Sequence, residues 1–257
     1  MKVNNHMHEL FWALRYIKRS LFLRKRLTGL SQTVTEWKNF WQSYRQYKTL
    51  ATACGESNPR IEELYPCLGD DTVETAIEPV YFYQDTWAFE QIAKISPSHH
   101  IDVGSHHKFV AFLSKIFPVT MVDIRPLSLA LASLQFKQGS ILQLPFEDSS
   151  VESLSSLCVV EHIGLGRYGD ELDALGSEKA VSELCRVLRP NGHLYISVPV
   201  NDVNKIFFNA HRAFEEKYFE QLLSSCEIID RKYISGDNLL PEKPNGYSIA
   251  LYHAVKA

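Results

Sequence analysis

The stretch from Ile101 to Pro199 decides the fold, because it carries five short segments in a characteristic order. Each segment is weak evidence alone, but their order and gaps predict the strands, glycine turns and crossover helices of an open α/β sheet. Ligands of such sheets bind outside the carboxyl ends of the strands, so we expect a nucleoside site there. The five segments are Ile-Asp-Val-Gly (101–104), Met-Val-Asp-Ile-Arg (121–125), Leu-Pro-Phe (144–146), Cys-Val-Val-Glu-His (158–162) and Leu-Arg-Pro-Asn-Gly-His-Leu-Tyr-Ile-Ser-Val-Pro (188–199).

Outward from this stretch, the hydrophobic pattern predicts alternating strands and helices. We expect an α/β fold with a doubly wound, mostly parallel sheet of seven strands and helices on both faces. The last two strands have no long helix between them, so one of them should run antiparallel. Turn residues at 189–192 are expected to end the preceding helix. The expected strands are 100–103, 119–123, 134–137, 153–159, 193–198, 227–234 and 247–255, and the expected helices are 84–95, 108–116, 178–188 and 214–223, with a helix or turn near 127–131.

The first 50 residues have a different charge balance from the rest of the chain. They hold ten Lys and Arg against two Glu, a net charge of +8, whereas the remainder holds seventeen against twenty-eight, a net of -11. Helical hydrophobic spacing over 8–27 and 33–50 predicts a basic helical arm. Such an arm could lie on an anionic membrane surface, or pack on its own domain or on a partner subunit with its basic residues solvated. The expected domains are the arm, 1–55, and the α/β domain, 56–257.

The composition excludes several classes of protein. Hydrophobic residues make up 45% of the chain, and a net charge of -3 gives no electrostatic case for nucleic acid. Five cysteines, an odd number without a C-x-x-C pair, indicate a reducing compartment. We therefore expect a cytoplasmic protein, with a peripheral membrane contact of the arm left open. The histidine doublets 99–100 and 106–107 lack the spacing of metal ligands, so no metal site is expected.

The ends of the first two predicted strands carry residues suited to a nucleoside. Asp102 and Gly104 follow the first strand, where a glycine lets a ligand approach the backbone closely. Asp123 ends the second strand, where a carboxylate can accept hydrogen bonds from both hydroxyls of a ribose. The alternatives are a simple tight turn for Gly104 and a cap on the next helix for Asp123. Their spacing favours the nucleoside site.

Over residues 80–257 the chain resembles class I S-adenosylmethionine (SAM)-dependent methyltransferases, which have a Rossmann-like fold. More closely, Val-Asp-Ile-Arg-Pro-Leu (122–127), Glu-His-Ile-Gly-Leu-Gly-Arg-Tyr-Gly-Asp (161–170) and Asn-Ala-His-Arg (209–212) resemble a small family of related domains of unknown function. The resemblance implies SAM as the cofactor, with the methionyl part in the loop after the first strand, the ribose on the acid after the second, and the adenine along the segment after the third. The implied cofactor-binding residues are Gln84, Asp102, Gly104, Ser105, Asp123, Ile124, Ser140 and Ile141.

Three positions depart from the usual methyltransferase pattern. His106 and Lys108 replace the second and third glycines of the turn after the first strand, where their side chains could crowd the methionyl group. Ser140 replaces a common acid, and a serine binds adenine less strongly than a carboxylate does. These departures favour an alternative function, a catalytically inactive methyltransferase-like protein that serves as a binding or assembly partner in glycan biosynthesis. A nicotinamide oxidoreductase is disfavoured, because the Gly-x-Gly-x-x-Gly turn is missing.

The segment after the fourth strand should meet a methyl acceptor. His162 is the candidate base, since an imidazole near neutral pKa can take a proton from a hydroxyl, and Asp170 would orient it or the substrate. Arg167 and Arg212 could clamp an anionic acceptor or pair with nearby acids. We therefore expect SAM-dependent methylation of a small polar acceptor, a hydroxyl or carboxylate of a sugar or glycan intermediate. The candidate catalytic residues are His162, Asp170 and His211, and the candidate substrate-binding residues are Arg167, Tyr168 and Arg212.

Overall fold

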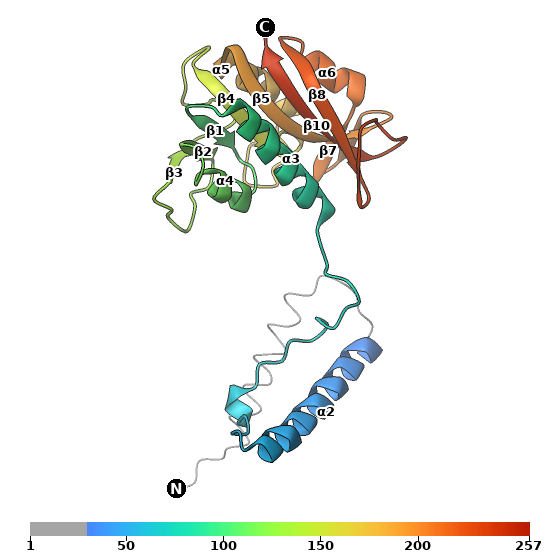
Figure 1. The fold of residues 1–257 in the computed structure, drawn as a ribbon. Coiled ribbons are helices and arrows are strands. Elements are labelled where there is room, and N and C mark those ends of the chain that lie inside the picture. Colours follow the sequence, from blue (N-terminus) through green and yellow to red (C-terminus); the bar gives the residue numbers. More distant parts are fainter. Residues whose placement is uncertain (1–29) are drawn as a thin grey trace. The chain divides into compact units, whose positions relative to one another are not determined.

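The computed structural model of the 257-residue chain describes residues 30–257, so the helix expected over 8–27 lies outside the described residues. The chain divides into two compact units between Ala76 and Ile77. Figure 1 shows both, with the large sheet in the second unit. No helix of the described residues is both long and apolar enough to span a bilayer.

The first unit contains the long helix α2 (Leu30–Cys54) and the short helix η1 (Ile61–Glu63). Aromatic rings at positions 37, 40, 41 and 44 make successive edge-on contacts along α2, with centroids 5.4–5.9 Å apart. The Tyr44 hydroxyl donates to the carbonyl of Pro59 at 2.9 Å and ties the helix to the segment that follows it. The helix expected over 33–50 is therefore present and extends beyond both expected ends.

The second unit is built on a sheet with the strand order β3-β2-β1-β4-β5-β10-β8-β9. Strands β1 to β5 are parallel along this path, and β10 is antiparallel to both β5 and β8. The expectation of a mostly parallel sheet with an antiparallel strand near its C-terminal end is confirmed. The strands are β1 (His100–Val103), β2 (Val119–Asp123), β3 (Leu134–Gln138), β4 (Val151–Leu157), β5 (Leu188–Asn201), β6 (Lys205–Phe207), β7 (His211–Glu215), β8 (Cys226–Ser235), β9 (Asn238–Leu240) and β10 (Ser248–Lys256).

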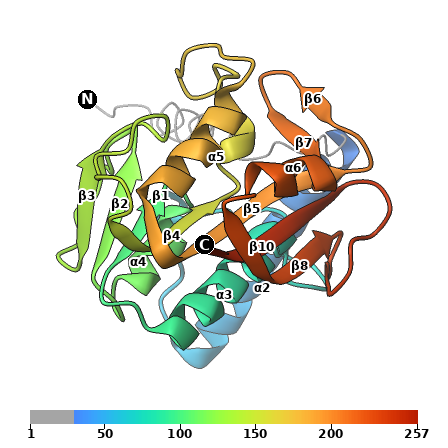
Figure 2. The same cartoon turned by 90° about the horizontal axis from the view of Figure 1, so that it is seen from above.

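Helices cover both faces of this sheet, as Figure 2 shows. The helices α3 (Pro79–Ile95) and α4 (His107–Leu113) pack on one face, and α5 (Gly176–Val187) and α6 (Glu216–Leu222) pack on the other. Successive side chains of a strand point to opposite faces, so Met121 joins the α3–α4 core while its neighbour Val122 joins the α5–α6 core. Both layers of the core are thus contributed by the same strands.

The strand order reverses beside β1. The chain runs outward from β1 to β2 and β3, then returns to place β4 on the opposite side of β1. Adjacent loops leave the sheet in opposite directions at such a point and open a crevice at the carboxyl ends of the strands. The crevice therefore lies between the ends of β1, β2 and β4.

Several local features differ from the expectations. The helix before residues 189–192 ends as expected, at Val187, but 189–192 lie within β5 instead of forming a separate turn. A left-handed Asn191 and a register shift between Val151 and Ser153 of β4 absorb the irregularity. The helix expected from 214 begins at Glu216, because 211–215 form β7. The β6–β7 hairpin and β9 were not expected at all. All three residues of β6 are exposed, so they carry no alternation between a buried and an exposed face.

Candidate functional site

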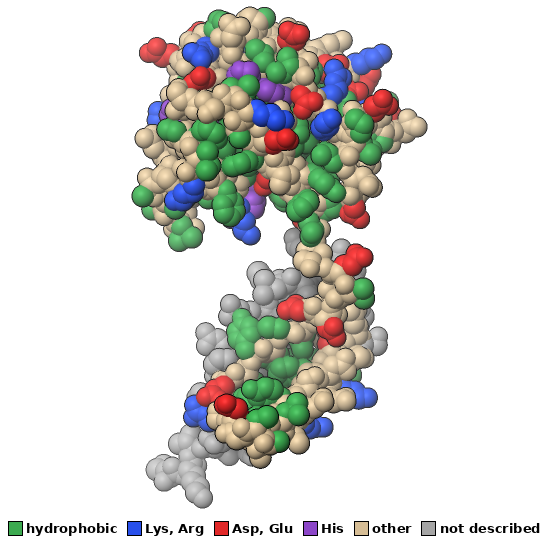
Figure 3. All heavy atoms as spheres, in the orientation of Figure 1, with side chains coloured by type: hydrophobic (Ala, Val, Ile, Leu, Met, Phe, Trp, Pro, Cys, Tyr) green, Lys and Arg blue, Asp and Glu red, His purple; other side chains and the backbone are tan. Residues whose placement is uncertain are grey.

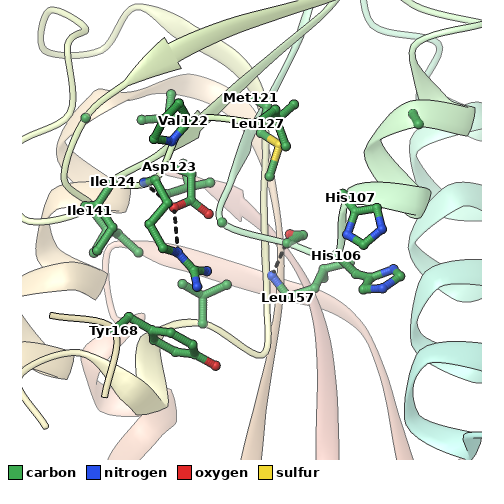
Figure 4. A pocket seen from close by; sticks show the side chains of 18 of the residues that line it. His106, His107, Met121, Val122, Asp123, Ile124, Leu127, Ile141, Leu157 and Tyr168 are labelled. Carbon is green, nitrogen blue, oxygen red and sulfur yellow. Dashed lines mark hydrogen bonds and ion pairs between the residues drawn. The ribbon is translucent and has the colours of Figure 1, made fainter. Parts of the chain in front are cut away.

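A cavity of about 890 Å³ opens at the reversal point of the sheet. This volume lies within the usual range of about 300–1,000 Å³ for small-molecule sites. Figure 4 shows Asp123, Ile124 and Ile141 on one side of the cavity and His106 and His107 on the other. The expected site residues that line it are Gly104, Ser105, Asp123, Ile124, Ile141, His162, Arg167 and Tyr168.

The turn after β1 forms the floor of this cavity. Gly104 has a φ of +72°, and a Cβ atom added there would lie 3.0 Å from Cγ1 of Val159, so only glycine fits without strain. The Ser105 hydroxyl accepts a hydrogen bond from the Leu157 amide at 3.0 Å and joins the turn to the end of β4. The turn is thus held rigidly, with its backbone facing the cavity.

Asp102 lies beneath this turn and not in the cavity, so its assignment as a cofactor ligand is corrected. The carboxylate is fully buried and accepts hydrogen bonds from the Ser105 amide at 3.1 Å and the Ser155 hydroxyl at 2.6 Å. Burial raises the pKa of Asp102 to about 6. Its role is to hold the backbone of the turn in place.

The side chains that replace the usual glycines leave the cavity open. His106 lines the cavity with its ring 4.8 Å from that of Tyr81, while Lys108 is exposed and does not line it. His106 also precedes α4 as its N-cap residue. Of the two residues that replace the glycines, only His106 can therefore crowd a ligand, and its neighbour His107 also lines the cavity.

Asp123 is the only acidic side chain among the described residues that line the cavity. Its Oδ1 accepts a hydrogen bond from the Arg125 amide at 2.8 Å and lies 3.6 Å from Nε of the same residue. The side chain is 15% exposed, so the carboxylate is within reach of a ligand. The guanidinium of Arg125 in turn lies 4.5 Å from the centre of the Tyr168 ring. This cation–π contact connects the end of β2 with the loop after β4.

Two more expected cofactor ligands lie elsewhere. Gln84 is fully buried in α3, where its side-chain oxygen accepts a hydrogen bond from the Ser197 hydroxyl at 2.6 Å. The Ser140 hydroxyl accepts from the Leu142 amide at 3.2 Å and shapes its own turn. Its neighbours Gly139 and Ile141 line the cavity instead. Neither Gln84 nor Ser140 is among the residues that line the cavity.

The loop after β4 presents His162 to the cavity. Its Nδ1 lies 2.6 Å from the carbonyl oxygen of Ala210, which can only accept, and 3.3 Å from Nη1 of Arg167, which can only donate. Because the contact with the carbonyl is the shorter one, we assign the proton to Nδ1 and a lone pair to Nε2. Burial lowers the pKa of His162 to about 4, so the ring is neutral at neutral pH. The neutral ring has the protonation state of a general base, but its pKa lies below the near-neutral value expected from the sequence, so His162 is a weak base in this state.

Three of the other expected acceptor residues do not line the cavity. Asp170 accepts hydrogen bonds from the Gly164 amide at 2.7 Å and the Tyr168 amide at 3.2 Å, so it orders the loop. Arg212 is buried and donates to Ser177 Oγ at 3.1 Å and to the carbonyl of Asp173 at 3.0 Å, so its role as a substrate clamp is corrected. The ring of His211 lies 6.4 Å from that of His162 and contacts Tyr247 and Phe207.

Tyr81 and Arg125 line the cavity, and neither they nor Glu161 was among the expected site residues. Arg125 follows Asp123, the acid predicted to bind the ribose, and Ile124, which was also predicted to bind the cofactor. This proximity in the sequence could have identified Arg125 as a candidate site residue. Glu161 directly follows the turn after β4 and is buried, with its pKa raised to about 8 by burial. Among residues 30–257, no cluster of three or more His, Cys, Asp or Glu side chains is suited to hold a metal ion.

The chain has the fold of class I SAM-dependent methyltransferases. It is similar to the 1,6-didemethyltoxoflavin-N1-methyltransferase of Burkholderia thailandensis, solved with S-adenosylhomocysteine, at 14% identity and a TM-score of 0.52 over 91% of this chain and 93% of that chain. It is also similar to the N-methyltransferase NodS of Bradyrhizobium japonicum, at 16% identity and a TM-score of 0.51 over 73% and 93% of the two chains. The [4+2]-cyclase SpnF matches at 12% identity and a TM-score of 0.51 over 67% and 81%.

Comparisons of sequence give a narrower result. A family model described as Caenorhabditis protein of unknown function, DUF268, matches residues 134–240, which is less than half of the chain. No curated protein matches the sequence. The structural matches therefore establish the fold, and the presence of a cyclase among them shows that this fold alone does not define one reaction.

Proposed function

We propose that the protein is a SAM-dependent methyltransferase that acts on a small polar acceptor. The observation that carries the proposal is the open cavity of about 890 Å³ at the reversal point of the sheet, with the Gly104 turn as its floor and Asp123 on its wall. A glycine turn and a carboxylate at the ends of adjacent parallel strands have the chemistry that an adenosyl ligand needs.

Each part of SAM has a matching group in the cavity. The backbone of Gly104 and Ser105 would hold the methionyl part, and the Asp123 carboxylate would accept hydrogen bonds from the ribose hydroxyls. Ile124 and Ile141 would provide apolar contacts to the adenine. When bound, the cofactor supplies a methyl group activated by a sulfonium, so the reaction does not depend on a metal.

The residues that line the cavity favour a polar methyl acceptor that carries oxygen atoms. The lining contains two arginines, Arg125 and Arg167, and a single acid, Asp123, which favours an anionic or hydroxyl-rich molecule over a cationic one. His162 would take the hydroxyl proton at Nε2, and Arg167 and Tyr168 would contact the acceptor. A hydroxyl or carboxylate of a sugar or glycan intermediate fits this lining.

Methyl transfer can be tested directly with methyl-labelled SAM and a panel of monosaccharides and uronic acids. The proposal predicts label in at least one sugar product, and loss of that label in His162→Ala. Binding of SAM without transfer to any member of a broad panel would instead favour the inactive binding partner.

The basic arm, residues 1–55, is proposed as a peripheral contact to an anionic membrane or a protein, consistent with its net positive charge and with a cytoplasmic location. On the face of the molecule that Figure 3 shows, basic and acidic side chains of the second unit are interspersed. This distribution supports a small-molecule enzyme more than a nucleic-acid-binding protein.

A further inference from the structure

Glu161 is a buried carboxyl group to which the proposed reaction gives no role. It lies in the short helix η2 (Val160–His162), which is separated from the end of β4 by two residues, and is 2% exposed. Its Oε2 has no hydrogen-bond partner among the described residues. A buried polar atom without a hydrogen-bond partner lowers the stability of the fold by roughly 1–3 kcal/mol. A buried carboxyl with such an atom therefore suggests a functional role.

The geometry couples Glu161 to His162. Oε1 of Glu161 lies 3.6 Å from Nε2 of His162, the nitrogen that keeps its lone pair. This distance is too long for a hydrogen bond, so Nε2 stays available to a substrate, yet it is short enough for a strong Coulomb interaction once Glu161 is ionised and His162 is protonated. His162 lines the cavity, whereas Glu161 lies behind it.

Resting on the proposed function, we infer that Glu161 is a positioning residue of the methyl transfer, whose ionised carboxylate stabilises the imidazolium that forms on His162. The acceptor oxygen forms the new bond to the methyl carbon while the carbon–sulfur bond breaks and its electron pair stays on sulfur. The hydroxyl proton passes to Nε2 of His162, and the resulting positive charge lies 3.6 Å from the Glu161 carboxylate.

The protonation states give this arrangement a pH dependence. Burial raises the pKa of Glu161 to about 8 and lowers that of His162 to about 4, so both groups are uncharged at neutral pH. When Glu161 ionises, a negative charge appears beside Nε2 and His162 becomes a stronger base. Turnover should therefore rise with pH through a limb near pH 8.

Other titratable and charged groups surround Glu161 and His162, but we assign the stabilisation of the His162 imidazolium to Glu161. Cys158 is within hydrogen-bonding reach of the Glu161 carboxyl, and Arg167 lowers the pKa of both Glu161 and His162. His211 lowers the pKa of His162 as well, whereas Asp170 raises it. The groups are Cys158 at the end of β4, Arg167 and Asp170 in the following loop, His211 on β7 and Tyr247 before β10.

A histidine titration by 15N NMR on the full chain tests the coupling without needing an acceptor. His162 is assigned by comparison with His162→Gln. We expect its Nε2 resonance in the wild type to show an inflection near pH 8 besides a step near pH 4. Glu161→Gln should lose the upper inflection, because the amide cannot ionise.

Glu178→Gln is the matched control, since Glu178 also has a buried oxygen without a partner but hydrogen-bonds Tyr218 instead of facing His162. This variant should keep the upper inflection. An upper inflection that is missing from the wild type, or that persists in Glu161→Gln, overturns the inference. Should Glu161→Gln fail to fold, Glu161→Asp takes its place, because it keeps a carboxyl group at a different distance from His162. Glu161→Asp should move the upper inflection to another pH, and an inflection that stays at the same pH also overturns the inference.

Calorimetry with SAM on the same samples separates the two proposals. If SAM does not bind, the proposed methyltransferase function is wrong, while the histidine titration still reports whether Glu161 and His162 are coupled. If SAM binds and the His162 titration is insensitive to Glu161, only the inference about Glu161 is wrong.

Discussion

At the scale of single residues, Asp123 should determine the affinity for the cofactor. It is the only acid that lines the described cavity, and it would accept hydrogen bonds from two ribose hydroxyls. A hydrogen bond to a charged group contributes about 1.5–3 kcal/mol, so Asp123→Ala should raise the Kd for SAM at least about tenfold. The exposed Glu171, which does not line the cavity, provides the control: Glu171→Ala should leave the Kd unchanged in calorimetry. Equal affinity of Asp123→Ala and the wild type would remove the ribose assignment.

Gly104 should matter for both the fold and the ligand. Gly104→Ala combines a backbone strained at φ +72° with a Cβ only 3.0 Å from Val159. Gly169→Ala has a similar strain at φ +85° with nothing within 4 Å, so the difference between the two variants isolates the close contact. We expect thermal unfolding to show a lower Tm for Gly104→Ala than for Gly169→Ala, by an amount that reflects about 1–3 kcal/mol. A Tm as high as that of Gly169→Ala would show that the turn has room to relax.

Gly104, Asp123 and His162 were predicted to lie close together because the ends of parallel strands meet at one edge of a sheet, and all three line the same cavity. Asp102 was misplaced, because its spacing in the sequence gives no sign of the Ser105 and Ser155 donors that hold the carboxylate under the turn. Polar side chains near a ligand site serve the protein and the ligand alike. Only their hydrogen-bond partners, which come from distant segments, decide between the two roles.

At the scale of elements, the loop between β4 and α5 depends on Arg212 of β7. The guanidinium of this buried residue donates to the hydroxyl of Ser177 and to the carbonyl of Asp173. Arg212→Ala would leave these acceptors unpartnered, so we expect urea denaturation to show a loss of about 2–4 kcal/mol. The surface pair Arg231–Glu220, at 2.7 Å, offers the control. Arg231→Ala should cost about 1 kcal/mol or less, and an equal loss in both variants would contradict the role of Arg212.

The sequence predicted the buried elements better than the peripheral ones. Strands β1 and β2 begin and end where the apolar pattern places them, because both of their faces pack against helices. The β6–β7 hairpin escaped prediction, since β6 is exposed throughout and pairs only with β7. Burial on both faces produces a readable pattern, and an exposed hairpin does not.

At the scale of the whole molecule, the buried histidine of β1 should make stability sensitive to acid. His100 is fully buried between the hydroxyls of Ser153 and Ser155, at 2.8 and 2.9 Å, and burial lowers its pKa to about 3. The unfolded chain takes up a proton near pH 6.5 and the folded chain does not, so stability falls as the pH drops from 6.5 toward 3. When the pH is lowered across this range, the free energy of unfolding measured by urea titration should fall less for His100→Gln than for the wild type. His99→Gln, an exposed neighbour, should behave as the wild type does, and an unchanged slope in His100→Gln would refute the explanation.

The central claim is that the cavity between β1, β2 and β4 admits an adenosyl ligand, and calorimetric titration of the full chain with SAM and S-adenosylhomocysteine measures it most directly. The account predicts one molecule bound per chain, with a Kd below about 1 mM for both compounds, which corresponds to roughly 4 kcal/mol or more. The absence of binding by either compound at millimolar concentration would contradict it.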